Sequence, residues 1–145
     1  MKIKTAIVTV LVTTIACFLL NGLFHVVLMG NYFDNAFKEF GSTVNRIKEA
    51  NPAWQLATEF VWVTAMYCLL ASKVTSALKI QQAIMAGMLM NAAVSATWNF
   101  INASLFKVFP VKIILPDLAF HILVIGTMAG LLMSSIHNKL QKEKT

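Results

Sequence analysis

Residues 5–30 read TAIVTVLVTTIACFLLNGLFHVVLMG and contain no Asp, Glu, Lys or Arg. A helix rises 1.5 Å per residue, so a run of this length crosses the ~30 Å hydrocarbon core of a bilayer. Three further apolar segments lie at residues 54–72, 82–106 and 116–137. Each has the about 20 residues that a membrane span needs. The sequence therefore predicts four transmembrane helices.

The composition of the 145-residue chain indicates the same class of protein. Hydrophobic residues make up 58% of it and charged residues 12%, which is more apolar surface than a soluble domain of this size can bury. Most connections between the segments are short, which implies antiparallel neighbours. We therefore expect residues 1–145 to form one all-α integral membrane domain, an up-and-down four-helix transmembrane bundle with the lipid bilayer around it.

The net charge of +6 predicts a sidedness rather than a nucleic-acid partner. The basic residues lie in tails and connections, with no nucleic-acid fold signature. The two tails and the second connection hold Lys2, Lys4, Lys73, Lys79, Lys139, Lys142 and Lys144, and the first and third connections hold Lys38, Arg46, Lys48, Lys107 and Lys112. By the positive-inside rule this bias predicts a bacterial inner-membrane protein with both termini in the cytoplasm.

The amino-terminal segment has the start of an export signal. Lys2 and Lys4 precede an apolar run that reaches Cys17, as in a lipoprotein signal. The apolar run continues to Met29, however, whereas an export signal becomes polar after its cleavage site, so we expect an uncleaved helix. Cys17 and Cys68 both fall inside apolar segments without CxxC spacing, which predicts buried free thiols.

The connection at residues 31–53 is the only long one, and its pattern predicts an amphipathic helix in the outer membrane interface. Its apolar residues recur at helical spacing and are Phe33, Phe37, Phe40, Val44 and Ile47. Its charged residues Asp34, Lys38, Glu39, Arg46 and Lys48 lie on the other faces, and Gly41 can interrupt the helix. Such a helix covers the mouth of the bundle, or acts as a lid or docking surface.

The few ionisable residues of the spans come to one level in an up-and-down path. His25 lies near the end of the first segment, Glu59 near the start of the second, and Asp117 and His121 open the fourth. All of these ends lie on the outer side. His25 and Glu59 are each about five residues, or ~7 Å, from that side. Since a charged side chain in a bilayer is costly without a partner, we expect these residues to form one polar cluster.

Helical spacing adds neutral polar residues to this cluster. Asn21 precedes His25 by four residues, and a polar face on the third segment runs through Trp98 and Asn102 beside Asn99. Residues four apart share a helix face, so we expect them to line the same pocket. A purely structural network is the alternative, because each charge also suits its helix dipole and interhelical hydrogen bonds contribute ~0.6 kcal/mol on average.

The residue types in the pocket are those of a metal site. Imidazole and carboxylate groups suit zinc, iron or a similar ion. The candidate metal ligands are His25, Glu59, Asp117 and His121, and the candidate residues for a bound cofactor or small polar ligand are Asn21, Trp98, Asn99 and Asn102. Two histidines on different helices also fit haem, although nothing else marks a haem site. A membrane-embedded enzyme is the third hypothesis, without a recognisable nucleophile motif.

The small size of the chain allows a different class of function. A four-helix protein without a soluble domain can be an accessory subunit of a larger membrane complex, or a homodimer. Gly126 and Gly130 form a small-xxx-small pair, which permits close helix packing either between chains or within one. The sequence leaves both arrangements open.

Short motifs give the chain a resemblance to a known family. Residues 98–102 read WNFIN, Phe109-Pro110 follows, and residues 117–121 read DLAFH. Together with the order of the spans, these resemble the uncharacterised bacterial membrane family called domain of unknown function 2177. The family has an aromatic-Asp-x-x-Asn pattern in its third helix and Asp-x-x-Trp-Gly at the start of its fourth. The chain departs from the family pattern at Asn21, Phe24, Asn99, Phe120 and His121. The resemblance implies the fold and the polar residues, and no activity.

Overall fold

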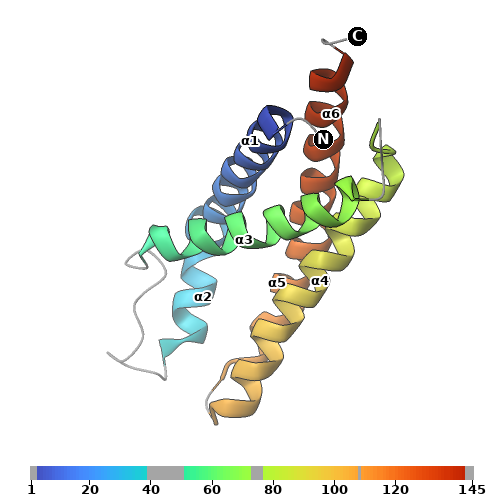
Figure 1. The fold of residues 1–145 in the computed structure, drawn as a ribbon. Coiled ribbons are helices and arrows are strands. Elements are labelled where there is room, and N and C mark those ends of the chain that lie inside the picture. Colours follow the sequence, from blue (N-terminus) through green and yellow to red (C-terminus); the bar gives the residue numbers. More distant parts are fainter. Residues whose placement is uncertain (1–2, 39–50, 73–76, 108, 143–145) are drawn as a thin grey trace.

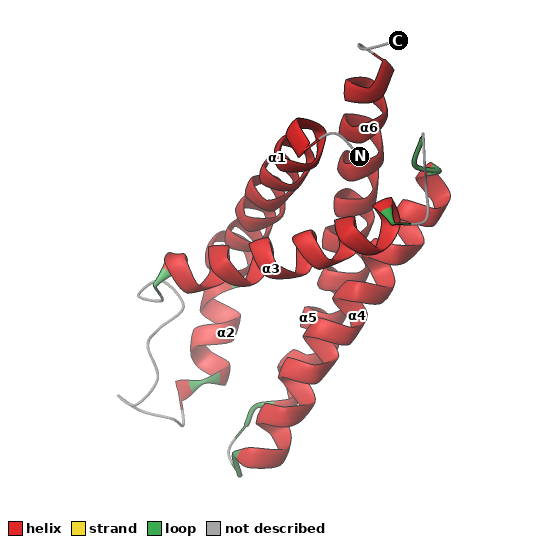
Figure 2. Cartoon of the chain, in the orientation of Figure 1, coloured by secondary structure: helices red, strands yellow, loops and turns green. Residues whose placement is uncertain are grey.

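The computed structural model describes residues 3–38, 51–72, 77–107 and 109–142. Within these residues the regular structure is helical and contains no strand (Figure 2). The helices are α1 (Ile3–Gly22), α2 (Gly30–Ala36), α3 (Pro52–Ala71), α4 (Ile80–Leu105), α5 (Ile114–Phe120) and α6 (Thr127–Lys142). Two π-helical segments, η1 (Leu23–Leu28) and η5 (His121–Gly126), and a 3-10 turn, η4 (Val111–Ile113), join them.

Three helical runs have the length and apolar composition to cross a membrane, at Ile3–Leu28, Ile80–Leu105 and Val111–Lys142. They correspond to the first, third and fourth expected spans. Their outward faces carry large exposed apolar residues such as Val27 and Leu89, which lipid solvates without cost. The protein is therefore an all-helical membrane protein.

The segment expected as the second span is helical but takes a different course. Asn51 caps α3, because its Oδ1 accepts a hydrogen bond from the Ala53 N–H at 3.0 Å, and Pro52 occupies the first helical position. Figure 1 shows α3 running across the other long helices rather than alongside them. Gln55, Thr58 and Glu59 reduce the apolar content of its first half. The regular up-and-down order that we expected thus does not extend to α3.

The packing of α4 against η5 and α6 is set by glycines. A Cβ atom at Gly126 would lie 2.7 Å from the Met88 Cα, and one at Gly87 or Gly130 would also collide with backbone of the facing helix. Only residues without a side chain permit this approach. The sequence allowed the Gly126-x-x-x-Gly130 pair to pack either between chains or within one. The structure shows that it packs against α4 of the same chain.

The main core lies between α1, α3 and α6. Val63, Met66, Ile125 and Met133 are fully enclosed there. Cys17 is buried in the same core, as predicted, whereas Cys68 is exposed and corrects our expectation of a buried thiol. Cys68 follows buried Tyr67 directly, so it points about 100° away from the core face of the helix.

A smaller apolar cluster fastens α2 to the connection between α4 and α5. Phe33 and Ala36 of α2 pack with Phe109 and Ile113, and the Tyr32 hydroxyl donates to the Lys112 carbonyl at 3.0 Å. Of the expected amphipathic helix, the described residues include the short helix α2. The remaining residues of that prediction, Glu39, Phe40, Gly41, Val44, Arg46, Ile47 and Lys48, lie outside the described residues.

Candidate functional site

Two histidines lie in the two π-helical segments, which directly follow α1 and α5. His25 belongs to η1 and His121 opens η5. The Nδ1 of each lies near the carbonyl oxygen four residues earlier, at 3.2 Å from Asn21 O and 2.9 Å from Asp117 O. A carbonyl oxygen only accepts, so each Nδ1 donates its proton to it, and Nε2 is the ring nitrogen that each histidine could offer to a bound ligand. π-Helical turns occur frequently at functional sites.

Asp117 joins these histidines to α4. Its Oδ1 lies 2.8 Å from His25 Nε2 and 3.4 Å from His121 Nδ1. Its Oδ2 accepts hydrogen bonds from Ser95 Oγ at 2.8 Å and from Asn99 Nδ2 at 2.6 Å. The two oxygens therefore have separate roles, because α4 holds one of them and the other faces the imidazoles.

His25, Asp117 and His121 form a group that could hold a metal ion. Each offers a ligand atom, and these atoms all lie within 4.8 Å of one another. The two imidazole centroids are 5.5 Å apart. The side chains of His25 and His121 keep 15% and 19% exposure, and that of Asp117 keeps 11%. These three side chains are thus mostly buried but keep some exposed surface.

Glu59 lies close by but has partners of its own. Its Oε1 accepts a hydrogen bond from the Asn21 side-chain amide, and its Oε2 accepts one from Trp62 Nε1 at 2.7 Å. Glu59 is only 4% exposed, and these two donors offset part of the cost of burying a carboxylate. It lies outside the group of residues whose ligand atoms converge. We had expected Glu59 among the metal ligands.

The neutral residues divide between the site and the surface. Asn99 donates to Asp117. Asn21 accepts a hydrogen bond from His25 at its backbone carbonyl and donates one to Glu59 from its side-chain amide. Trp98, in contrast, is 68% exposed, and the Asn102 side chain donates to the Trp98 carbonyl at 2.7 Å. The face that α4 buries instead runs through Asn91, Ser95 and Asn99, which are spaced by four residues. We had placed Trp98 and Asn102 on the pocket face.

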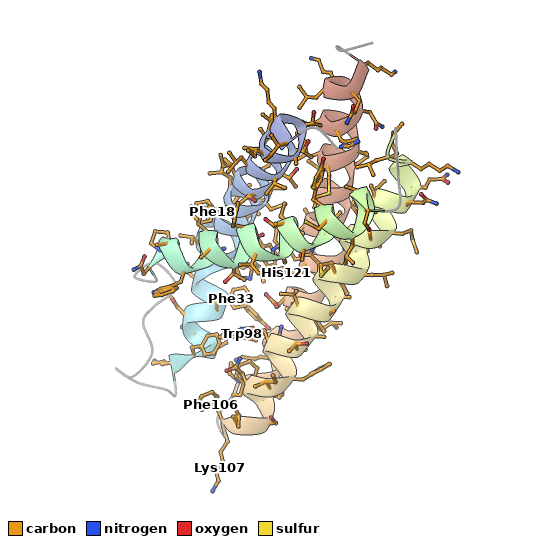
Figure 3. All side chains as sticks on the ribbon, viewed as in Figure 1. Phe18, Phe33, Trp98, Phe106, Lys107 and His121 are labelled. Carbon is orange, nitrogen blue, oxygen red and sulfur yellow. The ribbon has the colours of Figure 1, made fainter. Side chains whose placement is uncertain are left out.

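Aromatic rings surround His25. Phe24 stacks on Phe120 with centroids 3.8 Å apart, and Phe33 of α2 lies 4.9 Å from the His25 ring. Figure 3 shows His121 at the level where α3 crosses the bundle. These rings keep much of the site away from solvent, which strengthens the electrostatic interactions inside it.

Some residues of the site were missed from the sequence. Neither Ser95 nor Trp62 was among the candidate residues. Trp62 follows Glu59 by three residues, so both lie on the same helix face. This spacing could have predicted that the indole N–H of Trp62 donates to the Glu59 carboxylate. The aromatic contacts of Phe24 and Phe33 have no such signal, because they depend on how the helices approach one another.

Comparison with known proteins agrees that the chain is a membrane protein. The family model for predicted membrane proteins of DUF2177 matches residues 6–134, nearly the whole described chain. No curated protein and no solved structure shows a significant match. The resemblance inferred from the short motifs is confirmed, and the chain belongs to the family of predicted membrane proteins known as domain of unknown function 2177.

Proposed function

We propose that this protein binds a transition-metal ion inside the membrane through His25, Asp117 and His121. The observation that carries the proposal is the convergence of one ligand atom from each residue within 4.8 Å. The hydrogen bonds around these ligands support it. Metal-binding histidines almost always donate their other ring N–H to a carbonyl or carboxylate, and both histidines donate Nδ1 to a backbone carbonyl.

The ligand set favours zinc or ferrous iron over calcium or magnesium. Two imidazoles with one carboxylate suit borderline ions, whereas the hard cations prefer six or more oxygen ligands. Ser95 and Asn99 engage one oxygen of Asp117, so Asp117 binds through its other oxygen. Haem requires its axial histidines on opposite faces of a porphyrin, whereas both histidines here contact the same carboxylate. We therefore propose an ion and not haem.

The orientation that we propose has both termini in the cytoplasm of a bacterium. Figure 1 places the two termini at the same end of the molecule. Lys4, Lys139 and Lys142 belong to the terminal turns of α1 and α6, and Lys79 precedes α4. Basic residues accumulate on the cytoplasmic side of inner-membrane proteins. In this orientation the metal site lies toward the outer leaflet.

Accessory-subunit and enzyme functions have less support. The small-residue pair of Gly126 and Gly130 packs against α4, so it does not offer a surface to another chain. Ser95 donates its hydroxyl proton to Asp117, so it belongs to the hydrogen-bond network that holds this carboxylate. Metal binding remains the proposal with a specific geometric basis.

Metal analysis of the protein tests the proposal. The chain, carrying an affinity tag without histidine, is purified in mild detergent, supplied with zinc or ferrous iron, desalted and analysed by elemental mass spectrometry. We expect one equivalent of metal in the wild type and its loss in His25→Ala and in His121→Ala. His137→Gln is the matched control, because His137 is also buried but pairs with Tyr67 at 2.9 Å near the other end of α6. A wild type without bound metal, or equal metal in all variants, contradicts the proposal.

A further inference from the structure

A groove about 530 Å³ in volume lies between the end of α3 and the first turns of α4. It is lined by Leu70, Leu78, Lys79, Gln81, Gln82, Met85, Ala86 and Leu89. None of these residues takes part in the metal site. The first turns of α4, which line the groove, lie toward the end of the molecule that carries both termini (Figure 1).

The chemistry of the groove changes along its length. Lys79, Gln81 and Gln82 line it at the start of α4, and the apolar residues Met85 and Leu89 line it one and two turns further along the helix. Lys79 and Leu89 are ten residues apart, which corresponds to ~15 Å along the helix. One leaflet of a hydrocarbon core ~30 Å thick has the same depth. The groove therefore matches a molecule with a polar head and a chain that reaches the middle of the bilayer.

Leu78, which lines the groove, is held in place by hydrogen bonds to α6. The Asn138 side chain on α6 accepts a hydrogen bond from the Leu78 N–H at 2.8 Å and donates one to the Leu78 carbonyl at 2.9 Å. Leu78 is also only 3% exposed and packs in the main core. A preformed site binds more tightly than one that must be ordered, because less conformational entropy is lost.

We propose that this groove binds one anionic phospholipid, with its phosphate at Lys79 and one acyl chain along Met85 and Leu89. The charge of the residues that line the groove determines which lipid headgroup fits. These residues include a cation and two amides but no carboxylate, so a headgroup with net negative charge gains most. Basic pockets beside membrane helices on the cytoplasmic side bind such headgroups.

Native mass spectrometry of the full chain in mild detergent tests the proposal. The probes are phosphatidylglycerol and phosphatidylcholine with identical acyl chains, titrated separately. We expect one phosphatidylglycerol to bind in preference to phosphatidylcholine, and Lys79→Gln to weaken its binding about fivefold, the factor for one lysine near a membrane surface. Lys107→Gln is the control, because Lys107 is exposed at the opposite end of the molecule (Figure 3).

A second variant tests the apolar part separately. Ala86→Phe fills the groove and leaves Lys79 in place, so we expect it to abolish the bound lipid while metal content stays unchanged. The proposal is overturned if Lys79→Gln and Lys107→Gln bind phosphatidylglycerol equally, if the two lipids bind alike, or if Ala86→Phe retains wild-type affinity.

Discussion

Asp117 is the residue through which three helical elements meet. It lies in the first turn of α5, receives hydrogen bonds from Ser95 and Asn99 on α4, and faces His25 of η1. Removing one partner of a buried charge costs more than the interaction itself contributes, because the remaining charge stays buried. The contacts of Asp117 thus stabilise the fold whether or not a metal is bound.

A pair of serine variants on α4 measures this contribution. We expect Ser95→Ala to lower the free energy of unfolding by about 1.5–3 kcal/mol, the value for a hydrogen bond to a charged group. Ser104→Ala is the matched control, because Ser104 is exposed and donates only to the Ile101 carbonyl; its change should stay within about 0.5 kcal/mol. Denaturant unfolding of both variants in mixed micelles gives the comparison. Equal stability of the two would show that Ser95 does not support Asp117.

At the scale of elements, the π-helical segments and the glycine contact decide how polar faces align. In η1 the Met29 N–H bonds to the Phe24 carbonyl at 2.8 Å, five residues earlier. Such a turn inserts a residue and rotates the later part of the helix by about 100° relative to an uninterrupted α-helix. Both histidines lie in these turns. The direction of a side chain that follows His25 or His121 therefore cannot be read from regular α-helical spacing.

Two identical substitutions test the contact between α4 and η5. We expect Gly126→Ala to destabilise the protein by about 1–3 kcal/mol through overpacking, since its Cβ would lie 2.7 Å from the Met88 Cα. Gly22→Ala adds the same methyl group to α1 with no atom within 4 Å, and it should leave stability unchanged or raise it by up to about 1 kcal/mol. Thermal unfolding in detergent measures both. A Gly126→Ala protein as stable as Gly22→Ala would contradict the close packing.

At the scale of the whole molecule, the direction of the helices determines which groups share a side of the membrane. α1 and α6 pack side by side and antiparallel, so both termini lie at one end (Figure 1). The connection between α4 and α5 lies at the other end, where Lys107 points away from the bundle (Figure 3). The proposed metal site and the proposed lipid groove are consequently separated along the length of the molecule.

Cysteine labelling of intact cells tests this arrangement. In a Cys68→Ser background, in which Cys17 is buried, we expect a membrane-impermeant maleimide to label Lys107→Cys from outside. Lys139→Cys should react only after permeabilisation, because the proposed orientation places it in the cytoplasm. Labelling of both positions from the same side would contradict the opposed ends, and a reversed pattern would invert the proposed orientation.

Much of the class of protein could be predicted from the sequence because hydropathy and helix length are local quantities. The spans that include His25, Asn99 and Asp117 follow from runs of apolar residues and a fixed rise per residue. Their ends fix the depth of each polar side chain. That was sufficient to bring His25, Asp117 and His121 to one level, and the structure places them in contact.

What only the tertiary structure decided is which way each helix is turned and how it crosses its neighbours. The sequence could not show that Trp98 faces outward while Asn99 faces Asp117, that α3 crosses the bundle, or that Glu59 pairs with Asn21 and Trp62. These features depend on contacts between distant segments, such as Gly126 against Met88. Sequence periodicity describes each helix about its own axis, whereas the rotation and crossing of helices are set by the shapes of both surfaces.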